Sequence, residues 1–94
     1  MSSTRPPHAP SIRFDGSWTE EERVRIEEAL RRANSNMTNT QKERLRGRWI
    51  AQASRKRDTP YYVLHRRGMG QAFTGHSVEE VVRQVRQRWP PDGE

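Results

Sequence analysis

Residues 61–74 read YYVLHRRGMGQAFT and predict a β-hairpin. Residues 61–66 are rich in side chains that favour strands. Residues 67–70, RGMG, predict a glycine-bearing turn, and residues 71–74 predict a short return strand. Because an isolated hairpin is only marginally stable in water, we expect this one to pack on a helix.

The segment after the hairpin predicts that helix. Ser77 suits an N-cap, and Glu80 stands three residues later, where it would complete a capping box. Pro90 and Pro91 end the pattern. The apolar residues between these signals fall on one helical face, and we expect that face to cover the hairpin: Val78, Val81, Val82, Val85 and Trp89.

A first helix is predicted upstream of the hairpin. Ser17 and Thr19 are alternative N-caps for it, since each has a glutamate three residues later. An apolar stripe at helical spacing follows, and residues 34–36, NSN, end it. The stripe consists of Ile26, Ala29, Leu30 and Ala33.

A second helix is predicted from Thr38, with Gln41 at capping-box spacing, to about Lys56. Residues 58–60, DTP, break it. Its buried face would hold Leu45, Trp49, Ile50 and Ala53. The short connection between the two helices predicts an antiparallel helical hairpin.

The predicted fold class is therefore α+β, a helical hairpin followed by a β-hairpin and a C-terminal helix (ααββα) in one small single domain. We expect residues 13–90 to form this domain. Residues 1–12 are expected to be a flexible N-terminal tail and residues 91–94 a C-terminal tail. Ile12 and Phe14 could form a short extended segment before the turn-prone Asp15-Gly16.

The composition predicts a thin core and an anionic partner. Only 30% of the 94 residues are hydrophobic and 32% are charged, with a net charge of +6. A homodimer would add shared buried surface. Lys42 and Lys56 are the only lysines among 18 basic residues. Arginine binds phosphate through a planar fork, although a GC-rich genome would explain the same arginine content.

The excess charge lies in the middle of the chain. Residues 37–59 carry seven basic and two acidic side chains, a net +5, and residues 60–76 add +2. Residues 17–36 have five acidic and four basic side chains, and residues 77–94 have four acidic and three basic side chains. This asymmetry favours a directed anionic partner over a general role in solubility.

Two groups of basic residues are predicted to bind that partner. Within the second helix, Arg44, Arg48 and Arg55 would form one solvent-facing ridge at ~100° per residue, opposite the apolar face. Lys56 and Arg57 would extend the ridge at one end. Arg66 and Arg67 would lie at the tip of the β-hairpin. The alternative interpretation is a plain solvated helix face and an ordinary charged turn.

Aromatic residues are divided between the core and possible base stacking. Tyr61, Tyr62 and Phe73 could stack on bases, although at least half of them must be buried in a sheet with one covered face. The three tryptophans, Trp18, Trp49 and Trp89, are expected in the core of so small a protein.

No catalytic or metal-binding pattern is evident. The histidines His8, His65 and His76 lack the spacing of a zinc site, and the absence of cysteine excludes disulfides and thiolate ligands. No phosphate-binding glycine loop and no cofactor signature is present. We therefore expect a protein that is not an enzyme. We also expect a cytoplasmic protein without a membrane span.

The leading hypothesis is a small basic protein that binds DNA or RNA through phosphate contacts. The alternative hypothesis is a protein-interaction module that docks on an acidic surface of a larger complex. An accessory subunit or a viral or mobile-element regulator would fit that second class.

Overall fold

The computed structural model describes residues 11–56 and 58–91. Within them, four strands form one mixed sheet in the order β1-β2-β3-β4, with β1 parallel to β2 and the other neighbours antiparallel. The α+β class is therefore confirmed, but the sheet has more strands than predicted. The elements are β1 (Ile12–Gly16), α1 (Glu20–Asn36), α2 (Asn39–Arg44), β2 (Arg46–Lys56), β3 (Thr59–Arg67), β4 (Phe73–Gly75) and α3 (Val78–Arg88).

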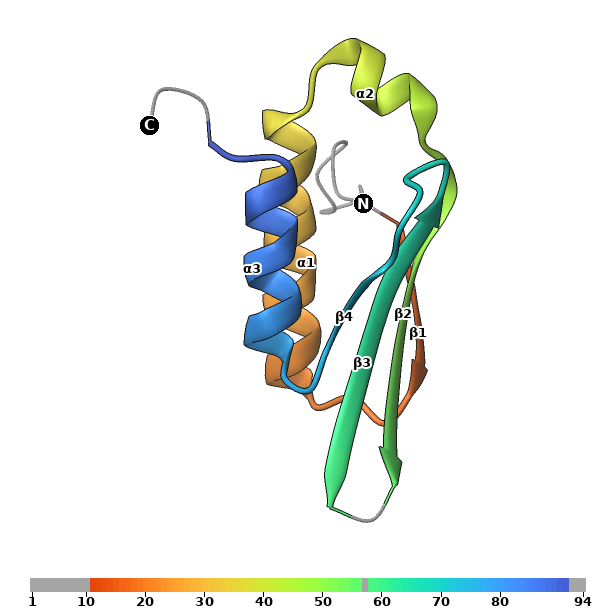
Figure 1. The fold of residues 1–94 in the computed structure, drawn as a ribbon, viewed down its shortest axis with the longest axis vertical. Helices are drawn as coiled ribbons and strands as arrows, with labels where there is room; N and C mark the ends of the chain where they lie inside the picture. The colour runs from red at the N-terminus through yellow and green to blue at the C-terminus, as the bar shows by residue number, and fades with distance from the viewer. Residues whose placement is uncertain (1–10, 57, 92–94) are drawn as a thin grey trace, which may run out of the picture.

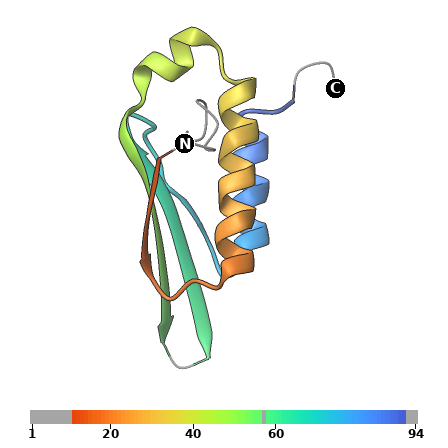
Figure 2. The same ribbon diagram turned by 180° about the vertical axis from the view of Figure 1, so that it is seen from behind.

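The molecule has two layers. Helices α1 and α3 lie side by side along one face of the sheet, and α2 bridges the two layers at one end (Figures 1 and 2). At the other end, β2 and β3 extend beyond their neighbours as a two-stranded ribbon. No described helix covers the opposite face of the sheet. The face that stays uncovered is the one available to a partner.

Helix α1 begins where the sequence predicts. Of the two alternative N-caps, Thr19 is the one used, and it forms a capping box with Glu22. Glu20 and Glu21 also lie in the first turn, where the helix dipole favours negative charge. The side chains buried against the sheet are Ile26, Leu30 and Ala33, which belong to the predicted stripe.

Helix α3 also follows its signals. Ser77 caps it by accepting a hydrogen bond from the backbone N–H of Glu80. The Glu80 carboxylate accepts instead from the N–H of His76, one residue before the predicted partner. Val78, Val81 and Val85 are buried on the face that covers the strands.

The predicted second helix is wrong beyond Arg44. Thr38 caps α2 with Gln41 as expected, but the helix ends after six residues and residues 46–56 form β2. Gly47 has φ +71°, which an L-residue in a helix does not adopt. The strand is stabilised by pairing with β1 on one side and with β3 on the other. Consequently α1 packs against α3, and the predicted helical hairpin does not form.

The predicted β-hairpin is confirmed with shifted boundaries. Leu64 pairs with Phe73, and Tyr62 pairs with Gly75, so β3 and β4 are antiparallel neighbours. Strand β3 also pairs with β2 along most of its length, which the sequence did not predict. The short extended segment expected at Ile12 and Phe14 is the edge strand β1, which also includes Asp15 and Gly16, the residues expected to form a turn.

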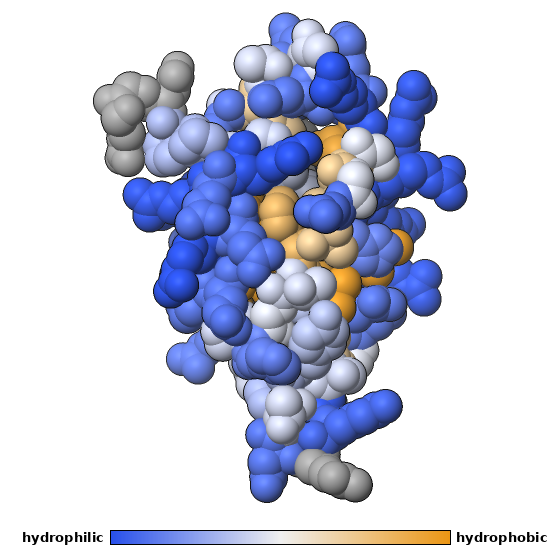
Figure 3. All heavy atoms as spheres, in the orientation of Figure 1, coloured by the Kyte–Doolittle hydropathy of each residue, from blue (hydrophilic) through white to orange (hydrophobic). Residues whose placement is uncertain are grey.

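The core lies between the helices and the sheet. Trp49 of β2 is fully buried and contacts Trp89 edge to face, with the ring centroids 6.0 Å apart. Phe73 packs on Trp89 in the same way at 5.8 Å. Trp18 is half-buried against this core, beside Phe14. In Figure 3 hydrophobic residues gather near the centre of the view, with hydrophilic residues on both sides of them.

Candidate nucleic-acid interface

The two faces of β2 have different surroundings because side chains alternate along a strand. Trp49, Ala51 and Ala53 are buried beneath the helices. The residues between them, such as Ile50 and Gln52, therefore face away from the helices. We call this uncovered side of the sheet the open face. Its residues are Arg13, Asp15, Ile50, Gln52, Ser54, Lys56, Thr59, Tyr61, Val63, His65 and Thr74. The register of β2 and β3 shifts between Arg46 and Ile50, and beyond this bulge Arg46 pairs with Arg67. Exposed Arg48 lies within the bulge, and we count Arg46, Arg48 and Arg67 with the open face.

The open face is strongly positive. All five of its cations are exposed, and Asp15 is its one carboxylate among the described strand residues. The Asp15 carboxylate is already paired with Arg13, whose Nε lies 3.1 Å from Asp15 Oδ1. An anion bound there would therefore meet little competition from carboxylates of the protein.

The opposed pair Arg46 and Arg67 concentrates this charge at one end of the sheet. The two residues are direct partners in the register of β2 and β3. Like charges in this position repel, and no described carboxylate is within ion-pair distance of either. A bound phosphate would remove that repulsion.

The backbone brings Arg44 close to the same end. Gly68 has φ +95°, and a Cβ added to it would lie 1.9 Å from the backbone oxygen of Arg44. Only glycine allows the loop after β3 to approach the end of α2 so closely. Exposed Arg44 therefore lies next to the junction that carries Arg46 and Arg67.

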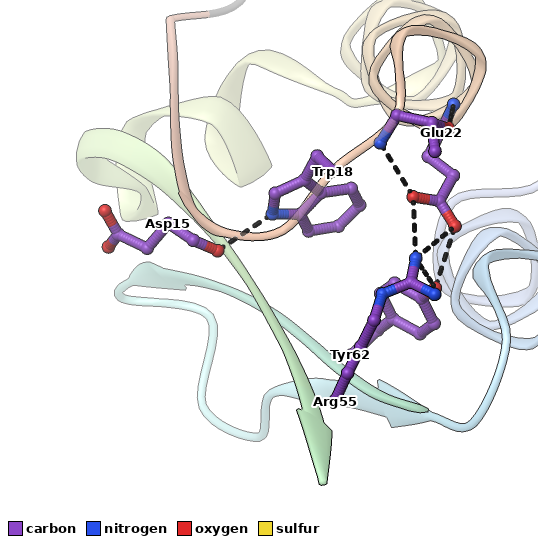
Figure 4. A network of polar contacts seen from close by, with 6 residues as sticks. Asp15, Trp18, Glu22, Arg55 and Tyr62 are labelled. Carbon is purple, nitrogen blue, oxygen red and sulfur yellow. Dashed lines mark hydrogen bonds and ion pairs between the residues drawn. The ribbon is translucent and has the colours of Figure 1, made fainter. Parts of the chain in front are cut away.

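Arg55 faces the helices and has intramolecular partners. Its guanidinium lies 3.4 Å from the Glu22 carboxylate and 3.3 Å from the Tyr62 hydroxyl. The Tyr62 hydroxyl donates a 2.8 Å hydrogen bond to Glu22 (Figure 4). Nearby, the Trp18 indole N–H donates to the backbone oxygen of Asp15 at 2.9 Å. The Glu22 contacts tie α1 to β2 and β3, and the Trp18 bond ties the segment before α1 to the end of β1.

The same contacts shift two pKa values. Partial burial alone would raise the pKa of Glu22, but the Thr19 N–H, the Tyr62 hydroxyl and Arg55 favour the carboxylate and lower it below 4.5. Burial, together with the hydrogen bond to Glu22, raises the pKa of Tyr62. Glu22 is therefore charged and Tyr62 neutral at physiological pH.

Arg66 is the second predicted cation that faces the core side. Its guanidinium carbon lies 5.6 Å from the centroid of the Trp49 ring. Burial lowers the pKa of Arg66, and its Nε has no hydrogen-bond partner among the described residues. Its stem covers the edge of the core, as arginine stems often do.

The predicted basic residues thus fall into two groups at opposite ends of β2. The helical ridge of Arg44, Arg48 and Arg55 is wrong, because residues 46–56 are a strand and Arg55 lies on the opposite face from Arg48. Arg44, Arg48 and Arg67 lie at the α2 end, and Lys56 lies at the ribbon end. Arg57 lies outside the described residues.

The three candidate stacking residues also separate. Tyr62 and Phe73 are buried, at 4% and 8% exposure, and belong to the core. Tyr61 is 41% exposed on the open face, where its ring packs beside His76 with centroids 5.6 Å apart. Tyr61 is therefore the candidate that a base could reach.

Sequence reasoning missed Arg13, Arg46 and Gln52 as open-face residues. The available signal was the alternation of apolar and polar side chains over residues 51–54, AQAS, which follows the apolar pair Trp49 and Ile50. The same residues also satisfy a helical spacing, and the helical interpretation concealed the open face.

A second basic surface lies on the outside of the helical layer. A groove of about 680 Å³ runs between α1 and α3. Its floor includes Ala29 and Val82, and Arg25 at one end is paired with Glu79. Its charged lining consists of Arg25, Glu28, Arg31, Arg32, Glu79, Arg83 and Arg86.

Other kinds of site are not evident in the described part of the chain. Residues 11–56 and 58–91 contain no cluster of three metal-ligating side chains. His76 is held by its Nδ1, 3.0 Å from the backbone oxygen of Pro60, and His8 lies outside the described residues. None of the helices described is long and apolar enough to cross a membrane.

Comparisons with known proteins add no family. No protein-family model, no curated protein and no solved structure matches this chain. The function must therefore be inferred from the open face and the groove themselves.

Proposed function

We propose that this chain is a non-enzymatic nucleic-acid-binding protein that contacts phosphates with the open face of its sheet. The observation that carries the proposal is the charge of that face. Five exposed cations lie there against one carboxylate, and that carboxylate is already paired with Arg13. Phosphate contacts from arginine and lysine supply most of the affinity in binding of this kind.

Arg48 and Arg67 are the central contacts in this proposal, with Arg46 and Lys56 on the same open face. Arg55 and Arg66 support the fold, because one is bonded to Glu22 and the other lies over Trp49. The opposed pair Arg46 and Arg67 favours an anionic ligand for a physical reason, since neutralisation relieves their mutual repulsion.

The test is fluorescence anisotropy with labelled DNA and RNA of mixed sequence at low salt. Two variants of equal net charge are compared: Arg48→Gln/Arg67→Gln on the open face, and Arg31→Gln/Arg32→Gln on α1. The open-face variant is expected to bind at least about tenfold more weakly, while the α1 variant keeps the affinity of the wild-type chain. Equal losses would mean that affinity follows net charge alone and would refute the proposed surface.

The groove between α1 and α3 favours a second candidate function, docking of an acidic protein segment. Its floor offers apolar contact at Ala29 and Val82, and its lining has five arginines against two glutamates. Carboxylates of a partner could pair with guanidiniums along the groove. A partner that is captured after nuclease treatment, and lost on Arg31→Glu/Arg32→Glu, would support this function. A partner that disappears with nuclease would exclude it.

A further inference from the structure

A shallow hollow lies in the middle of the open face. Its volume is about 350 Å³, and it spans β1, β2 and β3. Gln52 is its centre, because it pairs with Asp15 on one side and with Val63 on the other. Ser54 and its partner Tyr61 form the next row toward the ribbon.

Tyr61 gives this hollow an aromatic wall. It is one of two large apolar residues that the described part of the chain leaves exposed, the other being Val24 on α1. The contact with His76 holds the ring from one side. An exposed, positioned ring on a basic sheet is a platform on which any base can stack.

The remaining lining can contact the edge of a base. The Gln52 amide both donates and accepts hydrogen bonds, the Ser54 hydroxyl does the same, and the Asp15 carboxylate accepts. Val63 supplies an apolar floor. A planar ring with polar edges and two apolar faces fits this combination.

Cations flank the hollow on both sides along β2. Arg48 lies four residues before Gln52 and Lys56 lies four residues after it. The two cations are therefore separated by at most about 26 Å of strand, with the hollow between them. A strand that runs along β2 could therefore place one base in the hollow, with phosphates at Arg48 before it and at Lys56 after it.

We infer that the ligand of the open face is a single-stranded nucleic acid, with one unpaired base in the hollow against Tyr61. The inference rests on the proposed function. In a duplex the faces and Watson–Crick edges of the bases are occupied by stacking and pairing, so no base could enter the hollow and stack on Tyr61. Single strands expose the groups that Tyr61 and Gln52 can contact.

The experiment compares labelled single strands of about 20 nucleotides with the duplexes of the same sequence, for DNA and for RNA. The wild-type chain is expected to bind single strands at least about tenfold more tightly than duplex. Tyr61→Ala is expected to weaken single-strand binding about fivefold to 150-fold, the range for loss of one stacked ring, whereas Tyr61→Phe keeps the affinity within about twofold. Gln52→Ala tests the edge contacts independently, with circular dichroism confirming that each variant is folded.

Each outcome separates the inference from the function on which it rests. Duplex binding as tight as single-strand binding, with sensitivity to Arg48→Gln/Arg67→Gln, would overturn the inference and leave the proposed function standing. Single-strand binding that is unchanged in both Tyr61→Ala and Gln52→Ala would also overturn it. No binding to any nucleic acid would overturn both.

Discussion

The dependence of binding on salt can be predicted from the charges of the open face. Four of its cations have no carboxylate partner among the described residues: Arg46, Arg48, Lys56 and Arg67. Each phosphate that a cation neutralises on a single strand contributes about −0.7 to the slope of log K against log salt. Four contacts therefore predict a slope of about −2.8, which is about a 50-fold loss of affinity for a fourfold rise in salt.

Removing two of these cations should halve that dependence. For Arg48→Gln/Arg67→Gln the predicted slope is about −1.4, and the same rise in salt should cost only about sevenfold. Arg13 is not counted, because its Nε already lies 3.1 Å from Asp15 Oδ1. A phosphate that bound Arg13 would replace the Asp15 carboxylate, and the total charge neutralised would not change. The variant should therefore bind more weakly at low salt and approach the wild-type chain at high salt.

The assay is a series of anisotropy titrations between about 50 and about 200 mM salt. The charge-matched control, Arg31→Gln/Arg32→Gln, should keep the wild-type slope, because both arginines lie on α1. The reasoning is refuted if the two double variants have the same slope, or if the wild-type slope is near zero.

Three predictions concern the scaffold that holds the open face. Gly16→Ala should lower the free energy of unfolding by more than about 3 kcal/mol, because both a φ of +92° and a Cβ placed 1.9 Å from the Ala53 oxygen oppose it. Gly70→Ala shares the positive φ without the clash and should cost only about 1–2 kcal/mol, so equal losses in urea unfolding would contradict the packing argument. Tyr62→Phe should lower the free energy of unfolding by about 1 kcal/mol and Tm by about 4–8 °C, because it removes the hydrogen bond to Glu22. Tyr61→Phe should leave Tm unchanged, because the Tyr61 hydroxyl bonds none of the described residues. The folded-state pKa of Glu22 lies below 4.5, so the charged carboxylate stabilises the fold above that pH, and this contribution is lost as the pH falls. The Tm values of Glu22→Gln and of the wild-type chain should therefore converge in acid. A constant difference in Tm down to pH ~2 would count against the network.

The elements with strong local signals could be predicted from sequence. Thr19 and Thr38 cap their helices through side-chain bonds within three residues, and the valine face of α3 follows from spacing alone. Such signals depend on near neighbours in the chain, which the sequence displays directly.

Strand β2 could not be predicted in the same way. The spacing of Leu45, Trp49 and Ala53 fits a helix, but the same tryptophan and alanine also lie on one face of a strand. What decides between them is pairing with β1 and β3, which are distant in sequence. Propensity is a weak prior when such long-range contacts are available.

Some residues of the candidate site could be predicted, but its arrangement could not. Charge counting identified Arg48, Lys56 and Arg67, all of which are on the open face. It could not separate them from Arg55 and Arg66, because the direction of a side chain depends on which face of β2 or β3 it occupies.

The position of β1 at the edge of the sheet has a consequence for ligand affinity. Among the described strands β1 pairs only with β2, yet Asp15 and Gly16 form one wall of the hollow. Edge elements with few partners open locally at a smaller free-energy cost than the core does. A fluctuation that detached β1 from β2 would remove one wall of the hollow, so ligand binding and the pairing of β1 with β2 stabilise each other. Bound ligand should therefore slow amide hydrogen exchange in β1 more than in β3.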